Sequence, residues 1–240
     1  LKASDEIKTK PTQHSVKELR SLGISPDVLI CRSEQELPKD EKNKIALFCS
    51  VPNNSVISMH DVDTVYSIPV LLNKQKVDKT ILSKLKIRTT NPKLNDWKRV
   101  IKAKLLPERE VNVSFVGKYT ELKVSYKSIN EALEHAGIKN KAQVNINFVE
   151  AESITSKNIR KTLKNADAVL VPGGFGERGI EGMILACKYA RENDIPYLGI
   201  CLGMQVAIIE YARNVLKLKD ANSTEFNQDT KHPVIGLITE

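Results

Sequence analysis

Apolar and polar positions alternate along the second half of the chain in a regular order of short runs and helical stretches. Short apolar runs predict strands over 111–116, 144–149, 168–171 and 196–200. Apolar positions at helical spacing predict helices over 126–136, 159–163, 182–192 and 202–216. Gly117 is expected to end the first of these strands, and Gly137 to stop the first of these helices. This order of strand and helix predicts a parallel sheet with helices on both faces.

The first half gives a less regular pattern of the same kind. Helical spacing predicts helices over 15–23, 38–46 and 69–76, and an apolar run predicts a strand over 28–31. Residues 56–58 and 65–68 are expected to be short extended pieces. The pattern lacks opening strands of its own, so we expect the back part of a larger α/β domain.

A loop signal, Thr89-Thr90-Asn91-Pro92, separates the halves and is followed by a helix predicted over 93–105. We therefore expect a first domain over 1–88, a connector with one helix over 89–110, and a second domain over 111–240. The fold class is α/β with two incomplete parallel-sheet domains. The chain begins with Leu and ends in a strand-like run over 234–240, so we expect a fragment cut at both ends.

The sharpest chemical signal is Cys201, which lies between a predicted strand and a predicted helix, with Gly199 and Gly203 on either side. A tight strand-to-helix turn crowds the backbone, so the positions flanking it must be small. The helix N-terminus would direct its N–H groups at the sulfur and favour the thiolate. A lone cysteine is more often a buried apolar residue, but the paired glycines favour a nucleophile elbow. The other cysteines, Cys31, Cys49 and Cys187, lack this setting.

A second loop, Pro172–Gly179, carries four glycines after the predicted strand 168–171. Its bare backbone could approach a ligand closely, and the N–H groups of Gly173 and Gly174 could complete an oxyanion hole. A flexible surface turn is the alternative. A phosphate-binding loop is disfavoured because the spacing is not that of a P-loop and no lysine follows.

The composition indicates which class of protein this is and leaves the interpretation of the motifs unchanged. The 240 residues carry 37 basic and 29 acidic side chains, a net charge of +8, and 41% hydrophobic residues, which is typical of a globular protein. No apolar run is long enough for a membrane helix, and no signal peptide or nucleic-acid-binding motif is present. We therefore expect a cytoplasmic protein that binds neither membrane nor nucleic acid. The cysteine spacing predicts no metal site and no disulfide framework.

The motifs together resemble the CTP synthase family. Residues 172–179, 199–205 and 222–226 are similar to its class I glutamine amidotransferase domain. Residues 8–16, 30–33 and 44–49 resemble the C-terminal part of its synthetase domain. The resemblance implies ATP-dependent amination of UTP to CTP, in pyrimidine nucleotide biosynthesis, with ammonia from glutamine hydrolysis. It also implies ATP and Mg²⁺ as cofactors, GTP as an activator, and a homotetramer.

The resemblance assigns roles to particular residues. It makes Cys201 the nucleophile that forms a glutamyl thioester. The glutamine and oxyanion site would comprise Gly174, Leu202, Gly203, Met204, Gln205 and Glu225, with Glu225 pairing with the α-ammonium of glutamine. The UTP/CTP site would comprise Lys8, Thr9, Lys10, Pro11, Thr12, Gln13 and Lys44. The residues expected near ATP are His60, Asp61 and Val62. His135 and His232 are expected at the surface.

The family pattern is not complete in this sequence. No glycine-rich P-loop with a lysine occurs, and the family's catalytic His–Glu pair lies beyond the region matched here. We therefore expect the chain alone to be inactive, because general acid–base catalysis contributes about 10²–10⁴ in rate. Two alternatives stay open: a stand-alone glutaminase or hydrolase with a cysteine elbow, and a non-catalytic interaction remnant. The Lys8–Gln13 motif argues against the former.

Overall fold

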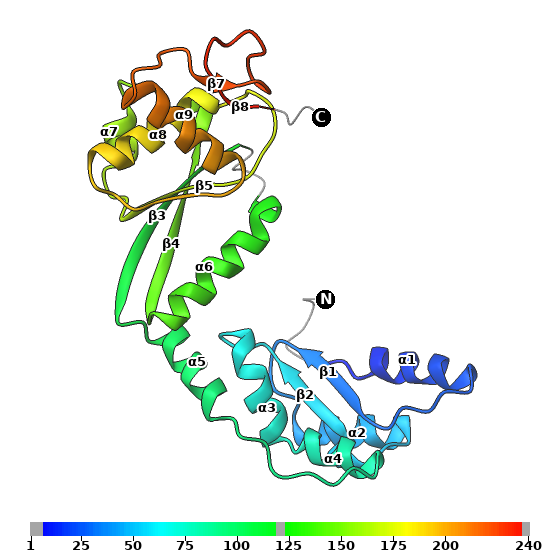
Figure 1. Cartoon of the computed structure of the whole chain (residues 1–240). Helices are drawn as coiled ribbons and strands as arrows, with labels where there is room; N and C mark the ends of the chain where they lie inside the picture. Colours follow the sequence, from blue (N-terminus) through cyan, green and yellow to red (C-terminus); the bar gives the residue numbers. More distant parts are fainter. Residues whose placement is uncertain (1–6, 119–122, 237–240) are drawn as a thin grey trace. The chain divides into compact units, whose positions relative to one another are not determined.

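The computed structural model describes residues 7–118 and 123–236, drawn in colour in Figure 1. The chain divides into two compact units, residues 1–106 and 107–240, which are described separately. The predicted connector, 89–110, spans this division: its helix lies in the first unit, and its last residues begin a strand of the second. Among the described residues, every helix is too short or too polar to cross a bilayer.

The first unit is a small parallel sheet surrounded by helices. Its elements are α1 (Lys10–Ser21), β1 (Leu29–Ser33), α2 (Lys39–Cys49), β2 (Val56–His60), α3 (Ile68–Lys74), α4 (Val77–Lys84) and α5 (Asn95–Leu105). The strands β1 and β2 pair in parallel with Leu29 opposite Val56. Val16, Ile45 and Cys49 form a buried cluster that packs α1 and α2 against these strands.

Three predictions for the first unit were wrong in detail. Helix α1 begins at Lys10 rather than near residue 15, because Pro11 fits the first turn of a helix, where its missing N–H is not needed. Residues 65–68 are not extended: Val65–Ser67 form a 3₁₀ turn, and the Thr64 side chain accepts a hydrogen bond from the N–H of Tyr66 (3.4 Å). Helix α4 was not predicted.

The second unit contains the regular alternation of strand and helix that the pattern predicted. Its main elements are β3 (Arg109–Gly117), α6 (Lys127–Lys139), β4 (Ala142–Glu150), α7 (Ile159–Thr162), β5 (Ala168–Val171), α8 (Ile180–Glu192), β6 (Tyr197–Gly199) and α9 (Leu202–Asn214). These strands form one parallel sheet in the order β4-β3-β5-β6. A small two-stranded sheet of β7 (Asn222–Ser223) and β8 (Pro233–Ile235) follows.

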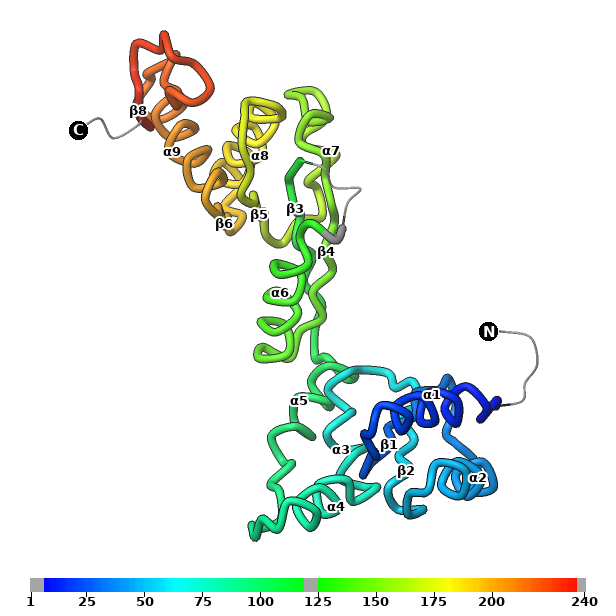
Figure 2. Tube along the Cα trace, turned by 90° about the vertical axis from the view of Figure 1, so that its right-hand side faces the viewer, coloured from blue at the N-terminus to red at the C-terminus, as the bar shows by residue number. Residues whose placement is uncertain are grey.

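Helices cover both faces of the larger sheet, as Figures 1 and 2 show for α6 on one side and α8 on the other. Phe115 and Leu170 point towards α6 and pack with Leu133. Val169 and Val171, at alternate positions of β5, point to the opposite face and pack with α8 and α9. The alternation of side chains along a strand therefore builds one apolar layer on each face.

Gly137 does not stop its helix, contrary to the prediction. Helix α6 continues to Lys139, and Gly137 is buried within it. A Cβ at this position would lie 2.6 Å from the carbonyl oxygen of Ala142 in β4. The glycine therefore permits close packing of α6 on the sheet rather than a left-handed end.

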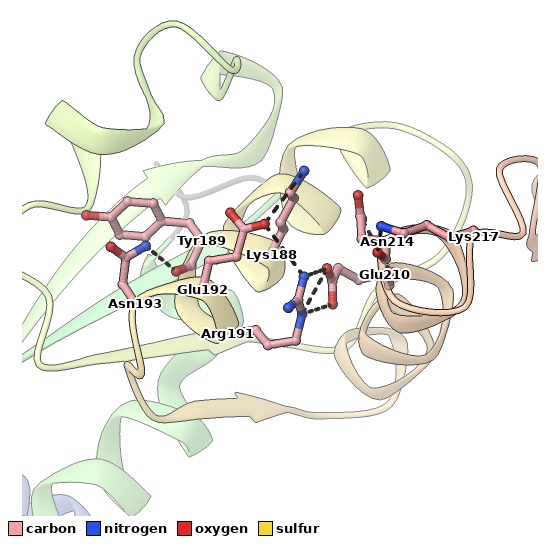
Figure 3. Close-up of polar contacts among 8 residues, drawn as sticks. All are labelled: Lys188, Tyr189, Arg191, Glu192, Asn193, Glu210, Asn214 and Lys217. Atoms are coloured by element: carbon pink, nitrogen blue, oxygen red, sulfur yellow. Dashed lines mark hydrogen bonds and ion pairs between the residues drawn. The ribbon is translucent and has the colours of Figure 1, made fainter.

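Helices α8 and α9 are joined by an ion pair whose carboxylate is buried, shown in Figure 3. The Arg191 guanidinium of α8 donates hydrogen bonds of 2.8, 3.0 and 3.2 Å to the carboxylate of Glu210 in α9. Glu210 is only 1% exposed. Because a buried charge is costly unless it is paired, this contact fixes how the two helices pack.

The order of the strands places the candidate site. From β3 the chain runs to β4 on one side of it, and later returns to β5 on the other side. In open parallel sheets, ligands bind outside the carboxyl ends of the strands at such a reversal. The segments after β3, β5 and β6 all lie at this edge of the sheet.

Candidate active site at the carboxyl ends of β3, β5 and β6

Cys201 occupies a sharp turn between β6 and α9. Its backbone has φ 54° and ψ −103°, a conformation that residues other than glycine rarely adopt. Its side chain is exposed, whereas Cys31, Cys49 and Cys187 are buried. The elbow geometry expected from the sequence is therefore present.

The two flanking glycines are required by close backbone contacts. A Cβ on Gly199 would lie 2.4 Å from the carbonyl carbon of Gly203. A Cβ on Gly203 would lie 2.1 Å from the carbonyl oxygen of Val171 at the end of β5. Both distances are far below van der Waals contact, so neither position tolerates a side chain, and α9 starts tightly against β5 and β6.

The glycine-rich loop after β5 lies against the elbow. A Cβ on Gly173 would lie 3.5 Å from the Cβ of Cys201, and one on Gly174 would lie 3.2 Å from the Leu202 side chain. Leu202 is the first residue of α9, so its N–H has no acceptor within the helix. The glycine-rich loop and the start of α9 thus both lie beside Cys201, and an oxyanion hole formed by their N–H groups stays a prediction.

Lys118 belongs to this site and was not predicted. It follows β3, is only 5% exposed, and its ammonium donates hydrogen bonds to the carbonyl oxygens of Phe175 (2.8 Å) and Gly176 (2.6 Å). Burial and the nearby Arg178 lower the pKa of Lys118, and Glu225 partly offsets this shift. The lysine therefore stabilises the glycine-rich loop through hydrogen bonds to two of its carbonyl groups. Its only sequence signal is a polar residue at the end of a buried strand.

Glu225 is brought to the same loop from a distant segment. Its Oε1 accepts a hydrogen bond from the N–H of Gly176 (3.1 Å), and its own N–H donates to the Ser223 side chain (3.2 Å). Lys118 and Glu225 therefore hold the loop by its carbonyl groups and its N–H group respectively. The role of Glu225 towards an α-ammonium stays a prediction.

Met204 and Gln205 occupy the first turn of α9. Met204 is 55% exposed, and Gln205 is partly buried. The Oε1 atom of Gln205 is buried without a hydrogen-bond partner among the described residues. Gly203, the third predicted member of this turn, contributes backbone packing instead of a side chain.

The histidines of this unit lie at the surface, as predicted. His232 is half exposed, and its Nε2 lies 3.4 Å from a carboxylate oxygen of Asp220. His135 is on the exposed face of α6. Within residues 7–118 and 123–236, no three His, Cys, Asp or Glu side chains are grouped so as to hold a metal ion.

In the first unit, two residues of the predicted nucleotide motif line a groove of about 710 Å³ over α1. They are Lys10 and Gln13. The remaining lining is mostly basic or polar, with one aromatic ring: His14, Val16, Lys17, Arg20, Ser21 and Phe48. Phe48, which is 61% exposed, was not predicted because an aromatic residue in a helical pattern usually indicates core.

The rest of the motif lies outside the lining of the groove. Thr9 is buried and accepts a hydrogen bond from the Gln13 amide (3.1 Å). Lys8, Pro11 and Lys44 are exposed. Thr12 is partly buried. The structure therefore places these residues around the start of α1 and on α2 but shows no single pocket that contains them all.

The residues expected near ATP lie at the carboxyl end of β2. His60 is its last residue, and Asp61 and Val62 follow it. The exposed Asp61 carboxylate lies 3.8 Å from the Arg32 guanidinium. The Nδ1 atom of His60 is buried with no partner in the described part of the chain.

Comparisons with known proteins agree with both halves of this description. Residues 1–87 match the family described as CTP synthase N-terminus, and residues 122–237 match glutamine amidotransferase class-I. A similar solved structure is the glutaminase domain of Trypanosoma brucei CTPS with bound acivicin. Its sequence is 42% identical, the TM-score is 0.51, and the match covers 53% of this chain and 50% of that chain. This chain thus spans about half the length of that structure.

The order of the two matched families is the order of the two units, and the site at Cys201 lies in the second. The similar structure is itself a CTPS glutaminase domain. This chain therefore carries, in this order, a part that matches the N-terminus of CTP synthase and a part that matches the class I glutamine amidotransferases.

Proposed function

We propose that this chain is part of a glutamine-hydrolysing CTP synthase, which uses ATP to aminate UTP to CTP. The observation that carries the proposal is Cys201, exposed in a strained turn at the start of α9 and flanked by Gly173 and Leu202. Acivicin, which is bound in the similar Trypanosoma brucei domain, is a glutamine analogue. Glutamine is accordingly the ligand we assign to this site.

The chemistry of hydrolysis follows from the geometry. The Cys201 sulfur attacks the side-chain amide carbon of glutamine, and the oxyanion accepts hydrogen bonds from the N–H groups of Leu202 and Gly174. The C–N bond then breaks, and ammonia leaves after taking up a proton. Water cleaves the resulting thioester and releases glutamate. The proton transfers need a base. We do not assign this role to His232, which lies at the surface.

The contacts of Glu225 support a role in holding the substrate. One carboxylate oxygen accepts the N–H of Gly176, which leaves the second oxygen for the α-ammonium of glutamine. The unpaired Oε1 of Gln205 offers a further hydrogen-bond acceptor in the first turn of α9.

The groove over α1 supports pyrimidine nucleotide binding by the first unit. Lys10, Lys17 and Arg20 surround it with positive charge, which suits a triphosphate, and Phe48 offers an aromatic surface. No step is assigned to Mg²⁺ in this chain, because Mg²⁺ is usually held by one or two carboxylates together with the phosphates of a bound nucleotide. ATP, GTP activation and the homotetramer are proposals that rest on the family alone.

Covalent labelling by acivicin tests the amidotransferase part. We expect one molecule of label per chain, on Cys201, with protection by glutamine. The variant Cys201→Ser should take up no label, while Cys31→Ser should label as the wild type does. Absence of labelling in folded protein would contradict the proposal and favour a non-catalytic remnant.

Binding of UTP tests the synthetase part. We expect the chain to bind UTP and Lys10→Ala to bind it at least about tenfold more weakly, since a phosphate contact contributes roughly 1.5–3 kcal/mol. The exposed Lys98→Ala on α5 serves as the control. Acivicin labelling without UTP binding would favour a stand-alone glutaminase with a cysteine elbow.

A further inference from the structure

Tyr197 connects the start of β6 to the start of α9. It is the first residue of β6, and its ring packs against the core formed by α8 and α9. Its hydroxyl donates a hydrogen bond of 2.8 Å to the carbonyl oxygen of Gly203. Gly203 is in the first turn of α9, directly after Cys201 and Leu202. A partly buried side chain thus contacts the turn that carries the reactive thiol.

The Tyr197 hydroxyl is a permanent donor in this position. Burial raises its pKa above the ordinary value of 10.0, and the neighbouring Cys187 adds to the shift. The Cys187 thiol is itself held neutral, because burial raises its pKa to about 12. At neutral pH the two groups are therefore uncharged, and the bond to Gly203 does not titrate.

The turn needs such support because it is strained. The positive φ of Cys201 costs free energy, and such a conformation persists only where surrounding contacts determine it. Backbone packing of Gly203 against Val171 is one such contact. The Tyr197 bond is another, and it is directional, because it fixes the orientation of the Gly203 carbonyl rather than its position alone.

We propose that Tyr197 is a positioning residue for Cys201, acting through the Gly203 carbonyl to hold the thiol and the Leu202 N–H in their reactive arrangement. The proposal deepens the proposed glutamine hydrolysis and rests on it for the prediction about turnover. The predicted effect on the reactivity of the Cys201 thiol does not depend on the proposed hydrolysis, because that reactivity can be measured without glutamine.

The distant end of α9 is held independently of Tyr197. The bidentate pair of Arg191 and Glu210, shown in Figure 3, ties this helix to α8 beyond its first two turns. Loss of the Tyr197 hydroxyl should therefore release only the first turn. The expected effect is on reactivity at Cys201 and not on the packing of the helix as a whole.

The test compares alkylation of Cys201 by iodoacetamide in the 240-residue wild type and in Tyr197→Phe, which keeps the ring. We expect alkylation to be about tenfold slower in the variant near pH 7, the effect of losing about one hydrogen bond. The far-ultraviolet circular dichroism should be unchanged.

Two control variants separate positioning from packing. Tyr189→Phe removes a hydroxyl from the same core, and that hydroxyl has no hydrogen-bond partner within the described ranges. Cys187→Ala removes the neighbouring thiol but leaves the hydrogen bond from Tyr197 to Gly203. In both control variants, Cys201 should be alkylated at the wild-type rate. If either slows as much as Tyr197→Phe, or if Tyr197→Phe alkylates as the wild type does, the proposal is overturned.

Glutamine turnover gives a second, separable readout. In a preparation that hydrolyses glutamine, we expect Tyr197→Phe to lower kcat about tenfold with little change in KM, because positioning acts on the transition state. A raised KM with unchanged kcat would contradict the proposal. If no preparation hydrolyses glutamine while the alkylation rates differ as expected, the proposed function fails and the positioning role stands.

Discussion

Single residues in this protein show how burial controls the chemistry of a thiol. Cys201 and Cys187 belong to the same unit, but one lies exposed at a helix start and the other inside α8. Burial, with the carboxylate of Glu210 nearby, raises the pKa of Cys187 to about 12. The Cys187 thiol therefore acts as a small apolar group, and the reactive thiol is the one that the fold exposes.

The shifted pKa of Cys187 predicts a pH dependence of stability. In the unfolded chain the thiol ionises near 9.0, whereas in the folded chain it stays protonated to about pH 12. Between these values the unfolded state binds fewer protons, so the free energy of unfolding falls as pH rises. We expect the wild type to lose about 2 kcal/mol more than Cys187→Ala between roughly pH 8 and 10.5.

Urea unfolding at both pH values measures this difference. Comparing the change within each protein removes the constant cost of truncating Cys187, and the contributions of Cys31 and Cys49 are common to both. Equal losses in wild type and variant would show that Cys187 titrates normally in the folded chain.

At the scale of elements, α9 has two faces of opposite character. Val206 and Ile209 are fully buried against the sheet. The outer face carries an apolar stripe at helical spacing that is 38–55% exposed, comprising Met204, Ile208, Tyr211 and Val215. The neighbouring edge strand β6 also exposes Leu198. Exposed apolar patches beside an open strand edge promote association.

The stripe on α9 predicts concentration-dependent self-association that a charge should reduce. We expect Ile208→Lys to lower association while leaving the melting temperature close to that of the wild type, because the side chain is 41% exposed. The adjacent Ile209→Lys, at a position with no exposure, should prevent folding. Sedimentation velocity over a concentration series checks the former. Unchanged association, or a destabilisation equal to that of Ile209→Lys, would refute this interpretation.

At the scale of the whole molecule, the two units have separate cores. The cluster around Ile45 and Cys49 lies in the first, and the clusters on the two faces of the larger sheet lie in the second. Every residue placed at the elbow also comes from the second unit, including Lys118, Gly174, Cys201 and Glu225. The candidate amidotransferase site therefore needs no residue of the first unit for its geometry.

This separation predicts that residues 107–240 fold alone and keep the reactivity of Cys201. We expect the isolated unit to be alkylated at the rate of the full chain, because a domain with its own core can fold independently. Limited proteolysis of the full chain should cut between the units before it cuts within them. A slower alkylation of the isolated unit, together with lost secondary structure, would show that the core of the second unit is insufficient.

Local sequence patterns were enough to locate the elements of the second unit and the elbow. Strands and helices of the second unit repeat with periods that local burial imposes, so their positions were predicted within a few residues. Gly199, Cys201 and Gly203 are close in sequence, and the steric demand of one tight turn explains all three. The family resemblance, carried by such local motifs, agrees with the families that match the chain.

Contacts between distant segments complete the site, and local sequence patterns did not predict them. The Lys118 ammonium donates a hydrogen bond to the Phe175 carbonyl of the glycine-rich loop, and the Glu225 carboxylate accepts one from the Gly176 N–H of the same loop. The Tyr197 hydroxyl donates a hydrogen bond to the Gly203 carbonyl. Gly137 was likewise predicted to end its helix, whereas its close contact with β4 explains why a glycine lies within α6. Local patterns record which side of an element is buried, because burial repeats with the backbone period. They do not record which partner lies on the other side, because that depends on how strands far apart in the sequence pair and on what their loops then meet.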